Sequence, residues 1–89
     1  MFEWDKSNSG HVKEHGLSTD DVEDALLDPR RLGAPAHDTF REQRRGVIGA
    51  TSAGRVIFVV ITRRGDALRV VTARDANKRE TRRYHRRGK

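Results

Sequence analysis

The feature that most constrains this chain is an unbroken apolar run at residues 56–61, Val-Ile-Phe-Val-Val-Ile. The run is far shorter than the roughly 20 residues that a membrane-spanning helix needs. Its β-branched residues favour an extended backbone. A strand that is apolar at successive positions is buried on both of its faces. We therefore expect residues 55–62 to form the central strand of a sheet.

Compact turn signals flank this strand on both sides. Ser-Ala-Gly at residues 52–54 and Arg-Gly-Asp at residues 64–66 each suit a tight connection, which favours antiparallel pairing with the neighbouring strands. These neighbours are predicted over residues 44–50 and 68–73. Alternation along the second neighbour places three side chains on one face: Leu68, Val70 and Thr72.

The N-terminal part of the chain predicts a short strand followed by a helix. Residues 2–4, Phe-Glu-Trp, alternate apolar and polar side chains as a strand does. Asp5 is suited to cap a helix over residues 6–15, and Gly16 suits the C-terminal stop of that helix.

A second helix has clear start and stop signals. Ser18 is an expected N-cap, and Asp21, three positions later, can close the capping box. The Asp-Pro pair at residues 28–29 ends this helix, because a residue before proline is pushed out of the helical region. Residues 30–40 are expected to form a loop or an edge strand, with an extra short strand allowed within residues 31–38.

The C-terminal helix, expected over residues 75–87, is strongly basic. Its cations recur every four residues in two adjacent rows, which cover about half of the helix circumference. Like charges at this spacing repel by roughly 0.2–0.5 kcal/mol per pair, and a bound polyanion would relieve that repulsion. The candidate RNA-binding face consists of Lys78, Arg79, Arg82, Arg83, Arg86 and Arg87.

Together these elements predict one α+β domain over residues 1–89 with the order β-α-α-β-β-β-α. Apolar residues make up 34% of the chain and charged residues 36%, so the core must be small. The absence of cysteine excludes disulfides and thiolate metal sites. With no membrane-spanning run and no signal peptide pattern, we expect a cytoplasmic protein without a membrane partner.

The charge is distributed unevenly along the chain. Residues 1–40 hold four basic and nine acidic residues, a net charge of −5, whereas residues 41–89 hold fifteen basic and four acidic residues, a net charge of +11. Such asymmetry favours a polyanionic partner for the basic half, with RNA or DNA first and an acidic protein second. A solubilising surface is the alternative interpretation.

Few motifs in the chain suggest a metal or nucleotide site. His11 and His15, with Glu14 between them, match the inverted zinc-peptidase pattern His-x-x-Glu-His, but no distinct third ligand stands out. Glycine-rich phosphate loops and recognisable serine or cysteine nucleophiles are absent. We therefore expect no metal and no cofactor.

The remaining polar residues suit RNA cleavage without a metal. Attack by a 2′-hydroxyl needs a base, cations to stabilise the phosphate and an acid for the leaving oxygen. The chain offers many arginines, one tyrosine, four histidines and Glu80. Composition alone does not distinguish this chemistry from RNA binding.

A series of short motifs gives a more specific indication. In chain order they are Phe-Glu-Trp-Asp at residues 2–5, His15-Gly16, Thr72-Ala73-Arg74, Lys78-Arg79-Glu80 and Tyr84. In this order and spacing the chain resembles the BrnT-type toxins of bacterial toxin–antitoxin pairs, over about residues 2–84. It is most similar to a shortened variant of that group, through Trp4-Asp5, Asn8, His11 and His15-Gly16.

The resemblance implies a RelE-like α+β fold: a twisted antiparallel sheet with two N-terminal helices and a basic C-terminal helix. It also implies ribonuclease activity on RNA, a small antitoxin protein as partner and contact with DNA only through the antitoxin complex. The catalytic residues carried over are His15, Arg74, Glu80 and Tyr84. The sequence departs from the family pattern before His-Gly, where Glu14 replaces the usual lysine, and at residues 30–40.

The roles expected for these residues are specific, and each has a structural alternative. Arg74 would stabilise the phosphate, Glu80 or His15 would accept the 2′-proton, and Tyr84 would contact the phosphate or assist the leaving group. Alternatively, Arg74 and Glu80 form internal ion pairs, Tyr84 anchors a polar helix and His15 caps or packs. The alternative function is a non-catalytic RNA-binding module with a basic C-terminal helix.

Overall fold

The computed structural model of the chain describes residues 1–36 and 43–87, and it also leaves out the side chain of Arg87. Within these ranges the chain forms three helices and a five-stranded sheet. In chain order the elements are β1 (Phe2–Glu3), α1 (Lys6–Glu14), α2 (Thr19–Leu27), β2 (Leu32–Pro35), β3 (Arg44–Ala50), β4 (Val56–Arg64), β5 (Ala67–Asp75) and α3 (Lys78–Arg87).

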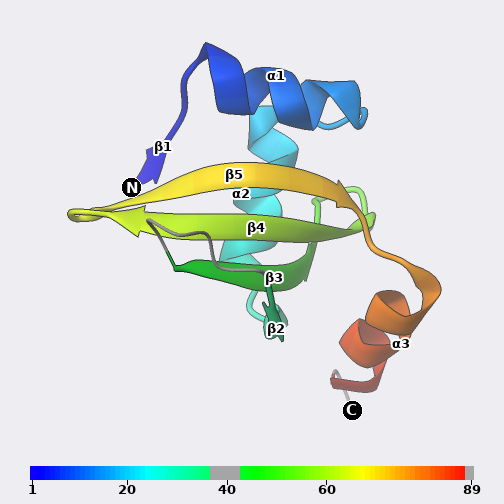
Figure 1. Cartoon of the computed structure of the whole chain (residues 1–89). Coiled ribbons are helices and arrows are strands. Elements are labelled where there is room, and N and C mark those ends of the chain that lie inside the picture. The colour runs from blue at the N-terminus through cyan, green and yellow to red at the C-terminus, as the bar shows by residue number, and fades with distance from the viewer. Residues whose placement is uncertain (37–42, 88–89) are drawn as a thin grey trace.

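The sheet has the strand order β1-β5-β4-β3-β2 and is mixed (Figure 1). The prediction of a wholly antiparallel sheet is wrong, because β1, the strand before the two N-terminal helices, pairs parallel with β5. The other pairs are antiparallel. The turn signals specified the hairpins β3–β4 and β4–β5. The β1–β5 pair joins distant parts of the chain, so no turn fixes its direction.

Strand β4 lies at the centre of the sheet, as its apolar run predicts. Ile57 and Val59 are fully buried on one face, and Phe58 is buried on the other. The strand runs two residues beyond the predicted end at Thr62, because the hairpin to β5 turns at Gly65, which has a positive φ of 57°. The prediction for β3 matches its observed bounds.

Helices α1 and α2 cover one face of the sheet and enclose the larger core (Figure 1). Gly49 of β3 permits close packing of α2, since a Cβ atom at this position would lie 2.3 Å from the carbonyl oxygen of Ala25. The buried members of this core are Val12, Leu17, Val22, Ala25, Leu26, Ile57, Val59, Ile61, Val70 and Ala73.

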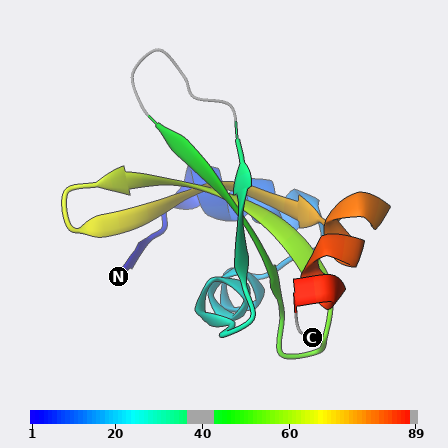
Figure 2. The ribbon, with the colours of Figure 1, turned by 90° about the horizontal axis from the view of Figure 1, so that it is seen from below.

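The opposite face carries a smaller core under α3. Figure 2 shows α3 and α2 on either side of strands β3 and β4. Tyr84 is the residue of α3 that enters this core, where it packs with Leu32, Ile48 and Phe58. The remainder of this sheet face, beyond the smaller core, forms the floor of the groove described below.

An irregularity in β5 overturns the predicted face of Thr72. Val60 pairs with Thr72 but the next residue, Ile61, pairs with Val70, so Val71 is the extra residue of a β-bulge. The bulge moves every later side chain of β5 to the opposite face. Thr72 therefore lies on the groove face, whereas Val70 belongs to the larger core.

The predicted helix caps are present. Asp5 accepts hydrogen bonds from the backbone of α1, and Asn8 closes its capping box. Ser18 and Asp21 form the predicted box at α2. Gly16 adopts a positive φ of 73° after α1, as its role of helix stop requires.

Asn8 also connects three elements in the interior. Its side-chain nitrogen donates to the carbonyl oxygens of Glu3, at 2.8 Å, and Val70, at 2.9 Å. This side chain is 2% exposed, and it ties α1 to both strands of the parallel pair. An asparagine suits this buried position because its amide group can both donate and accept the hydrogen bonds that the surrounding backbone offers.

The segment at residues 30–40 contains the extra strand β2, while residues 37–40 lie outside the described part of the chain. Helix α3 starts at Lys78, later than the expected residue 75, because β5 continues to Asp75. Asn77 then begins the helix by accepting a 2.8 Å hydrogen bond from the backbone nitrogen of Glu80. None of the helices in the described ranges is long and apolar enough to cross a bilayer.

Candidate nucleic-acid interface

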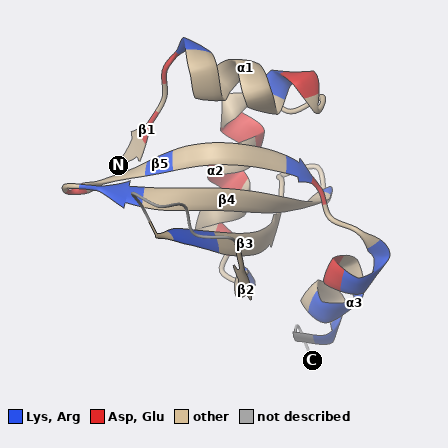
Figure 3. Cartoon of the chain, in the orientation of Figure 1, with Lys and Arg blue, Asp and Glu red and all other residues tan. Residues whose placement is uncertain are grey.

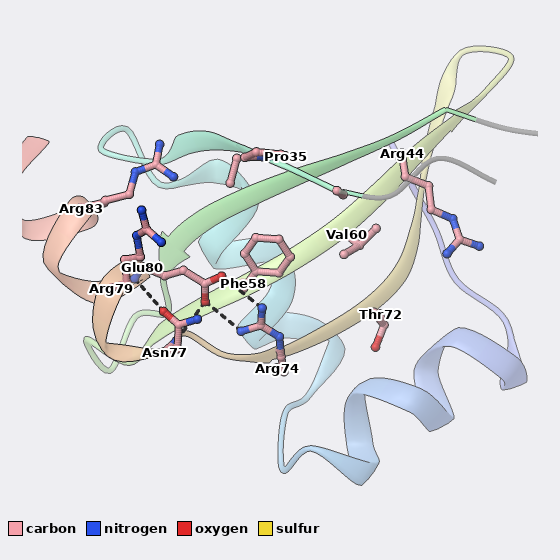
Figure 4. A pocket seen from close by; sticks show the side chains of 12 residues that line it. Pro35, Arg44, Phe58, Val60, Thr72, Arg74, Asn77, Arg79, Glu80 and Arg83 are labelled. Atoms are coloured by element: carbon pink, nitrogen blue, oxygen red, sulfur yellow. Dashed lines mark hydrogen bonds and ion pairs between the residues drawn. The ribbon is translucent and has the colours of Figure 1, made fainter.

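An open groove of about 750 Å³ crosses the sheet face that α1 and α2 leave uncovered (Figure 4). Its floor comes from strands β2 to β5, and one wall comes from α3 and the residues before it. The lining residues are Ala34, Pro35, Ala36, Arg44, Phe58, Val60, Thr72, Arg74, Asn77, Arg79, Glu80 and Arg83.

Arg74 and Glu80 form the central charged pair of the groove. The Nη1 and Nη2 atoms of Arg74 donate to the two carboxylate oxygens of Glu80 at 2.8 and 3.1 Å. The Arg74 guanidinium also lies over the ring of Phe58, 4.5 Å from its centroid, and donates to the carbonyl oxygen of Asp75. Three groups thus fix one cation, which lowers the entropic cost of using it to bind a ligand.

The hydrogen bonds of Arg74 leave one edge of its guanidinium available. Within the described residues, both Nη1 hydrogens and one Nη2 hydrogen are used. A guanidinium has five N–H donors. The Nε–H and the second Nη2–H therefore remain, and in the planar group they point along the same edge. That edge can bind two oxygens of one phosphate while Glu80 keeps its own contact.

Glu80 is a carboxylate held in place from two directions. Besides the contacts with Arg74, it accepts a 2.9 Å hydrogen bond from the backbone nitrogen of Asn77. Its side chain is 15% exposed. The hydrogen bond with Arg74 lowers the pKa of Glu80, burial opposes this effect, and the Asn77 bond adds to it. Glu80 is therefore ionised at neutral pH.

Gly46 of β3 makes room for the ring that supports Arg74. A Cβ atom at Gly46 would lie 2.7 Å from the Cζ atom of Phe58 and 2.8 Å from the carbonyl oxygen of Ala34. The ring therefore occupies the space that a side chain at this position would fill. Since Phe58 and Arg74 are paired residues on β4 and β5, the position of the ring sets the position of the guanidinium.

Basic residues continue from the groove along α3 (Figure 3). Arg79 and Arg83 line the groove, and both also line a second hollow of about 410 Å³ on α3. The members of this second hollow are Arg79, Arg82, Arg83 and Arg86. Lys78 is exposed beside them, and the side chain of Arg87 lies outside the described part. The arginines form a continuous cationic path that fits a phosphate backbone.

Tyr84 lies one helical turn after Glu80 but contacts a different group. Its hydroxyl donates to Oδ2 of Asp28, and its side chain is 8% exposed. Burial raises the pKa of Tyr84, and the bond with Asp28 raises it further. Asp28 also accepts from the backbone of Arg30 and Ala50. The Tyr84 hydroxyl therefore anchors α3 to the loop after α2 and is not among the groove-lining groups.

His15 lies on the other side of the fold, at the C-terminus of α1. Its carbonyl oxygen and that of Gly16 accept hydrogen bonds from Arg55, at 3.1 and 2.9 Å. Arg55 also pairs with Asp75 at the end of β5. His15 is exposed and does not line the groove, so the structure brings Arg74 and Glu80 together but not His15.

The sequence did not predict the roles of several residues that build the groove or hold its wall in place. In the sequence Phe58 is one of six residues in the apolar run, and nothing there indicates its contact with Arg74, which depends on strand register. Asn77 did have a signal, because a glutamate three residues later is the pattern of a capping box. Asp28 was recognised only as a helix end, and its contact with Tyr84 spans 56 positions.

Among the described residues, no group of three or more His, Cys, Asp or Glu side chains is close enough together to hold a metal ion. His11 and His15, the pair in the zinc-like pattern, are both exposed on α1 or at its end. The charged side chains among the described residues that line the groove are four arginines and one carboxylate, and such groups can act on a phosphodiester.

Comparison with known proteins agrees with this picture. Residues 4–80 match the family model described as ribonuclease toxin, BrnT, of type II toxin–antitoxin system. Comparison with curated proteins gives no significant match. The matched segment covers most of the 89-residue chain and includes the groove residues from Ala34 to Glu80. The chain therefore belongs to the BrnT family of ribonuclease toxins of type II toxin–antitoxin systems.

Proposed function

We propose that this protein is a metal-independent endoribonuclease with a RelE-like arrangement of helices around its sheet, acting in the cytoplasm. The observation that carries the proposal is the half-buried pair of Arg74 and Glu80 in an open groove. Arg74 is fixed yet keeps two donors on one edge, and α3 supplies further arginines beside it. A phosphate bound at that edge would lie next to an ionised carboxylate.

The proposed reaction is attack by a 2′-hydroxyl on its own 3′-phosphate. The bond from the 2′-oxygen to phosphorus forms, and the bond from phosphorus to the 5′-oxygen of the next nucleotide breaks. A base takes the 2′-proton, and water in the open groove supplies the proton that the leaving 5′-oxygen takes up. The products are a 2′,3′-cyclic phosphate and a 5′-hydroxyl.

We assign the phosphate-stabilising role to Arg74. Negative charge builds on the non-bridging oxygens as the new bond forms, and a fixed, planar bidentate donor stabilises that charge best. The ring of Phe58 and the carboxylate of Glu80 hold the guanidinium before substrate arrives. Arg79 and Arg83 on the same groove would bind the flanking phosphates.

We assign the base to Glu80 and not to His15, because Glu80 lines the groove. Its lowered pKa keeps it charged but makes it a weak base. A phosphate on the free edge of Arg74 offsets the positive charge that lowers this pKa. Substrate binding therefore raises the basicity of Glu80 at the step that needs it.

Tyr84 becomes a positioning residue in this proposal. Its bond to Asp28 fixes α3, and α3 carries Glu80, Arg79 and Arg83. With its hydroxyl donated to a carboxylate and its pKa raised, Tyr84 acts on catalysis through the helix it holds.

The alternative is a non-catalytic RNA-binding module, and one observation favours it. Both carboxylate oxygens of Glu80 already accept hydrogen bonds, from Arg74 and from the backbone of Asn77. Glu80 could therefore serve only to start α3 and to hold Arg74. Binding of RNA without cleavage by the wild-type protein, with or without ribosomes, would select this alternative.

We also propose a cognate antitoxin with an acidic segment as the protein partner. Such a segment would neutralise the arginines of α3 and block the groove at the same time. Contact with DNA would then come only through the antitoxin complex. Co-purification of the chain with the product of an adjacent small reading frame tests this proposal, and its absence under native expression would argue against it.

The test of activity is cleavage of a mixed RNA by purified protein in the presence of EDTA. Arg74→Ala should reduce cleavage by about 10²–10³-fold, as for loss of one donor to a developing oxyanion. Arg63→Ala is the matched control, because Arg63 is an exposed arginine outside the groove. Full activity of Arg74→Ala would remove this residue from the mechanism. Activity abolished by EDTA would point instead to a metal held by His11 and His15.

A further inference from the structure

The groove has an apolar floor next to its charged wall. Ala34, Gly46, Val60 and Thr72 follow one another across β2 to β5 as paired residues. A second, adjacent row on the same face contains the paired residues Leu32, Ile48, Phe58 and Arg74. Tyr84 of α3 packs over this second row. In the first row Gly46 is buried, whereas Ala34 and Val60 pack against the edge of the buried cluster and are only partly buried themselves.

Pro35 extends this floor at the edge strand. Its ring is exposed and lines the groove, as Figure 4 shows together with Val60 and Phe58. We call Ala34, Pro35 and Val60 the apolar shelf. Because Gly46 has no side chain, the ring of Phe58 fills the space over its backbone, so the surface between Ala34 and Val60 is also apolar.

The surroundings of the apolar shelf restrict what can occupy it. Arg74, Arg79 and Arg83 lie on the α3 side of the groove, so an occupant of this shelf must carry negative charge close by. The occupant must also present a flat apolar surface to the shelf. A nucleotide has both parts, and a groove of about 750 Å³ is large enough to hold one.

We propose that the apolar shelf seats one unpaired nucleobase of a single strand, whose adjoining phosphate lies on Arg74. This proposal rests on the proposed function and deepens it by specifying the state of the substrate. A base in a duplex presents its faces to its neighbours in the stack, so it has no free face for the shelf. The protein therefore acts on unpaired RNA.

Strands that cannot be cleaved test binding of a base at the apolar shelf separately from catalysis. The probes are a short oligothymidylate and an abasic deoxyribose-phosphate strand of the same length, which carries the same charge but no bases. Neither has the 2′-hydroxyl that cleavage needs. Fluorescence anisotropy should show that the wild-type protein binds the strand with bases about 5- to 10-fold more tightly.

Variants of the apolar shelf locate the effect. Pro35→Ser removes the exposed ring, and Val60→Thr keeps the side-chain shape while replacing a methyl with a hydroxyl. Both should reduce the preference for the strand with bases and leave affinity for the abasic strand unchanged. Leu27→Ser is the matched control, since Leu27 is 66% exposed and lies outside the groove. Thermal melts confirm that each variant is folded.

The outcomes distinguish binding of a base at the apolar shelf from ribonuclease activity. Equal affinity for the two strands, or a preference that Pro35→Ser and Val60→Thr both leave intact, overturns the seat even if the protein cleaves RNA. A preference lost in both variants supports the seat even if no cleavage is found, and the ribonuclease proposal alone then fails. Tight binding of an acidic peptide that Pro35→Ser weakens equally would assign the apolar shelf to the protein partner and overturn the proposal.

Discussion

Replacement of Tyr84 by phenylalanine tests whether this residue anchors α3. The substitution keeps the ring in the smaller core and removes the hydroxyl that donates to Asp28. A hydrogen bond to a charged group contributes about 1.5–3 kcal/mol. Since Asp28 keeps its bonds from the backbone of Arg30 and Ala50, we expect a loss at the lower end, about 1.5–2 kcal/mol.

This loss is large for a chain of 89 residues. In a domain of this size about 1 kcal/mol corresponds to a shift of about 4–8 °C in Tm, so Tyr84→Phe should melt about 6–16 °C below the wild type. Urea unfolding followed by the fluorescence of Trp4, the one tryptophan, gives the free energy directly. Well below the melting temperature, the folded variant should cleave RNA within about threefold of the wild-type rate.

A double-mutant cycle with Asp28→Ala isolates the contact. If the bond between Tyr84 and Asp28 carries the loss, Tyr84→Phe should cost less than about 0.5 kcal/mol in the Asp28→Ala background. Two results would refute the reasoning. One is an unchanged free energy of unfolding in Tyr84→Phe, and the other is a folded variant that loses cleavage by about 10²-fold, as expected for a catalytic acid.

Three further predictions concern the groove. Gly46→Ala should reduce stability by about 1–3 kcal/mol and also slow cleavage, because the added Cβ displaces the ring of Phe58. Acidification should destabilise the wild type more than Glu80→Gln. The pKa of Glu80 in the folded state is lowered from its ordinary 4.5, so its stabilising contribution is fully present above 4.5 and is lost as the pH falls from there through the lowered folded pKa. Binding of single-stranded RNA should weaken with salt, with a log–log slope of about −3.5 if about five phosphates are neutralised, and Arg82→Ala should reduce the magnitude by about 0.7.

Each of these predictions has a clear contrary result. For Gly46→Ala, the matched control is Gly10→Ala, since a Cβ at Gly10 meets no atom within 4 Å, and equal behaviour of the two variants would contradict the role of the ring. If the free energy of unfolding, measured in urea, depends on pH in the same way for the wild type and Glu80→Gln, the ion pair of Arg74 and Glu80 adds no stability. Salt-insensitive binding in anisotropy titrations would mean that the arginines of α3 do not contact phosphates.

The central part of the fold was predictable because its signals are local. The apolar run fixes β4, the glycine turns fix its hairpins, and Ser18 with Asp21 marks the start of α2. Each of these signals lies within a few residues of the feature it specifies. The parallel pairing of β1 and the bulge at Val71 have no such local signal, since both depend on how distant strands pack.

The candidate site was predictable in composition more than in geometry. The charge pattern indicated the arginines of α3, and the ion-pair alternative for Arg74 and Glu80 is the contact that the structure contains. The position of His15 could not be derived, because it depends on which face of the sheet α1 covers. The support of Arg74 by Phe58 depends on the bulge, which places Arg74 and Thr72 on the groove face.

The most direct test of the central claim is end-group analysis of RNA treated with the purified protein in EDTA, with Arg74→Ala and Arg63→Ala beside the wild type. The mechanism predicts 2′,3′-cyclic phosphate and 5′-hydroxyl ends from the wild type and from Arg63→Ala, formed about 10²–10³-fold more slowly by Arg74→Ala. Products with 5′-phosphate ends, or cleavage that requires an added divalent metal, would contradict attack by the 2′-hydroxyl at a groove built on Arg74 and Glu80.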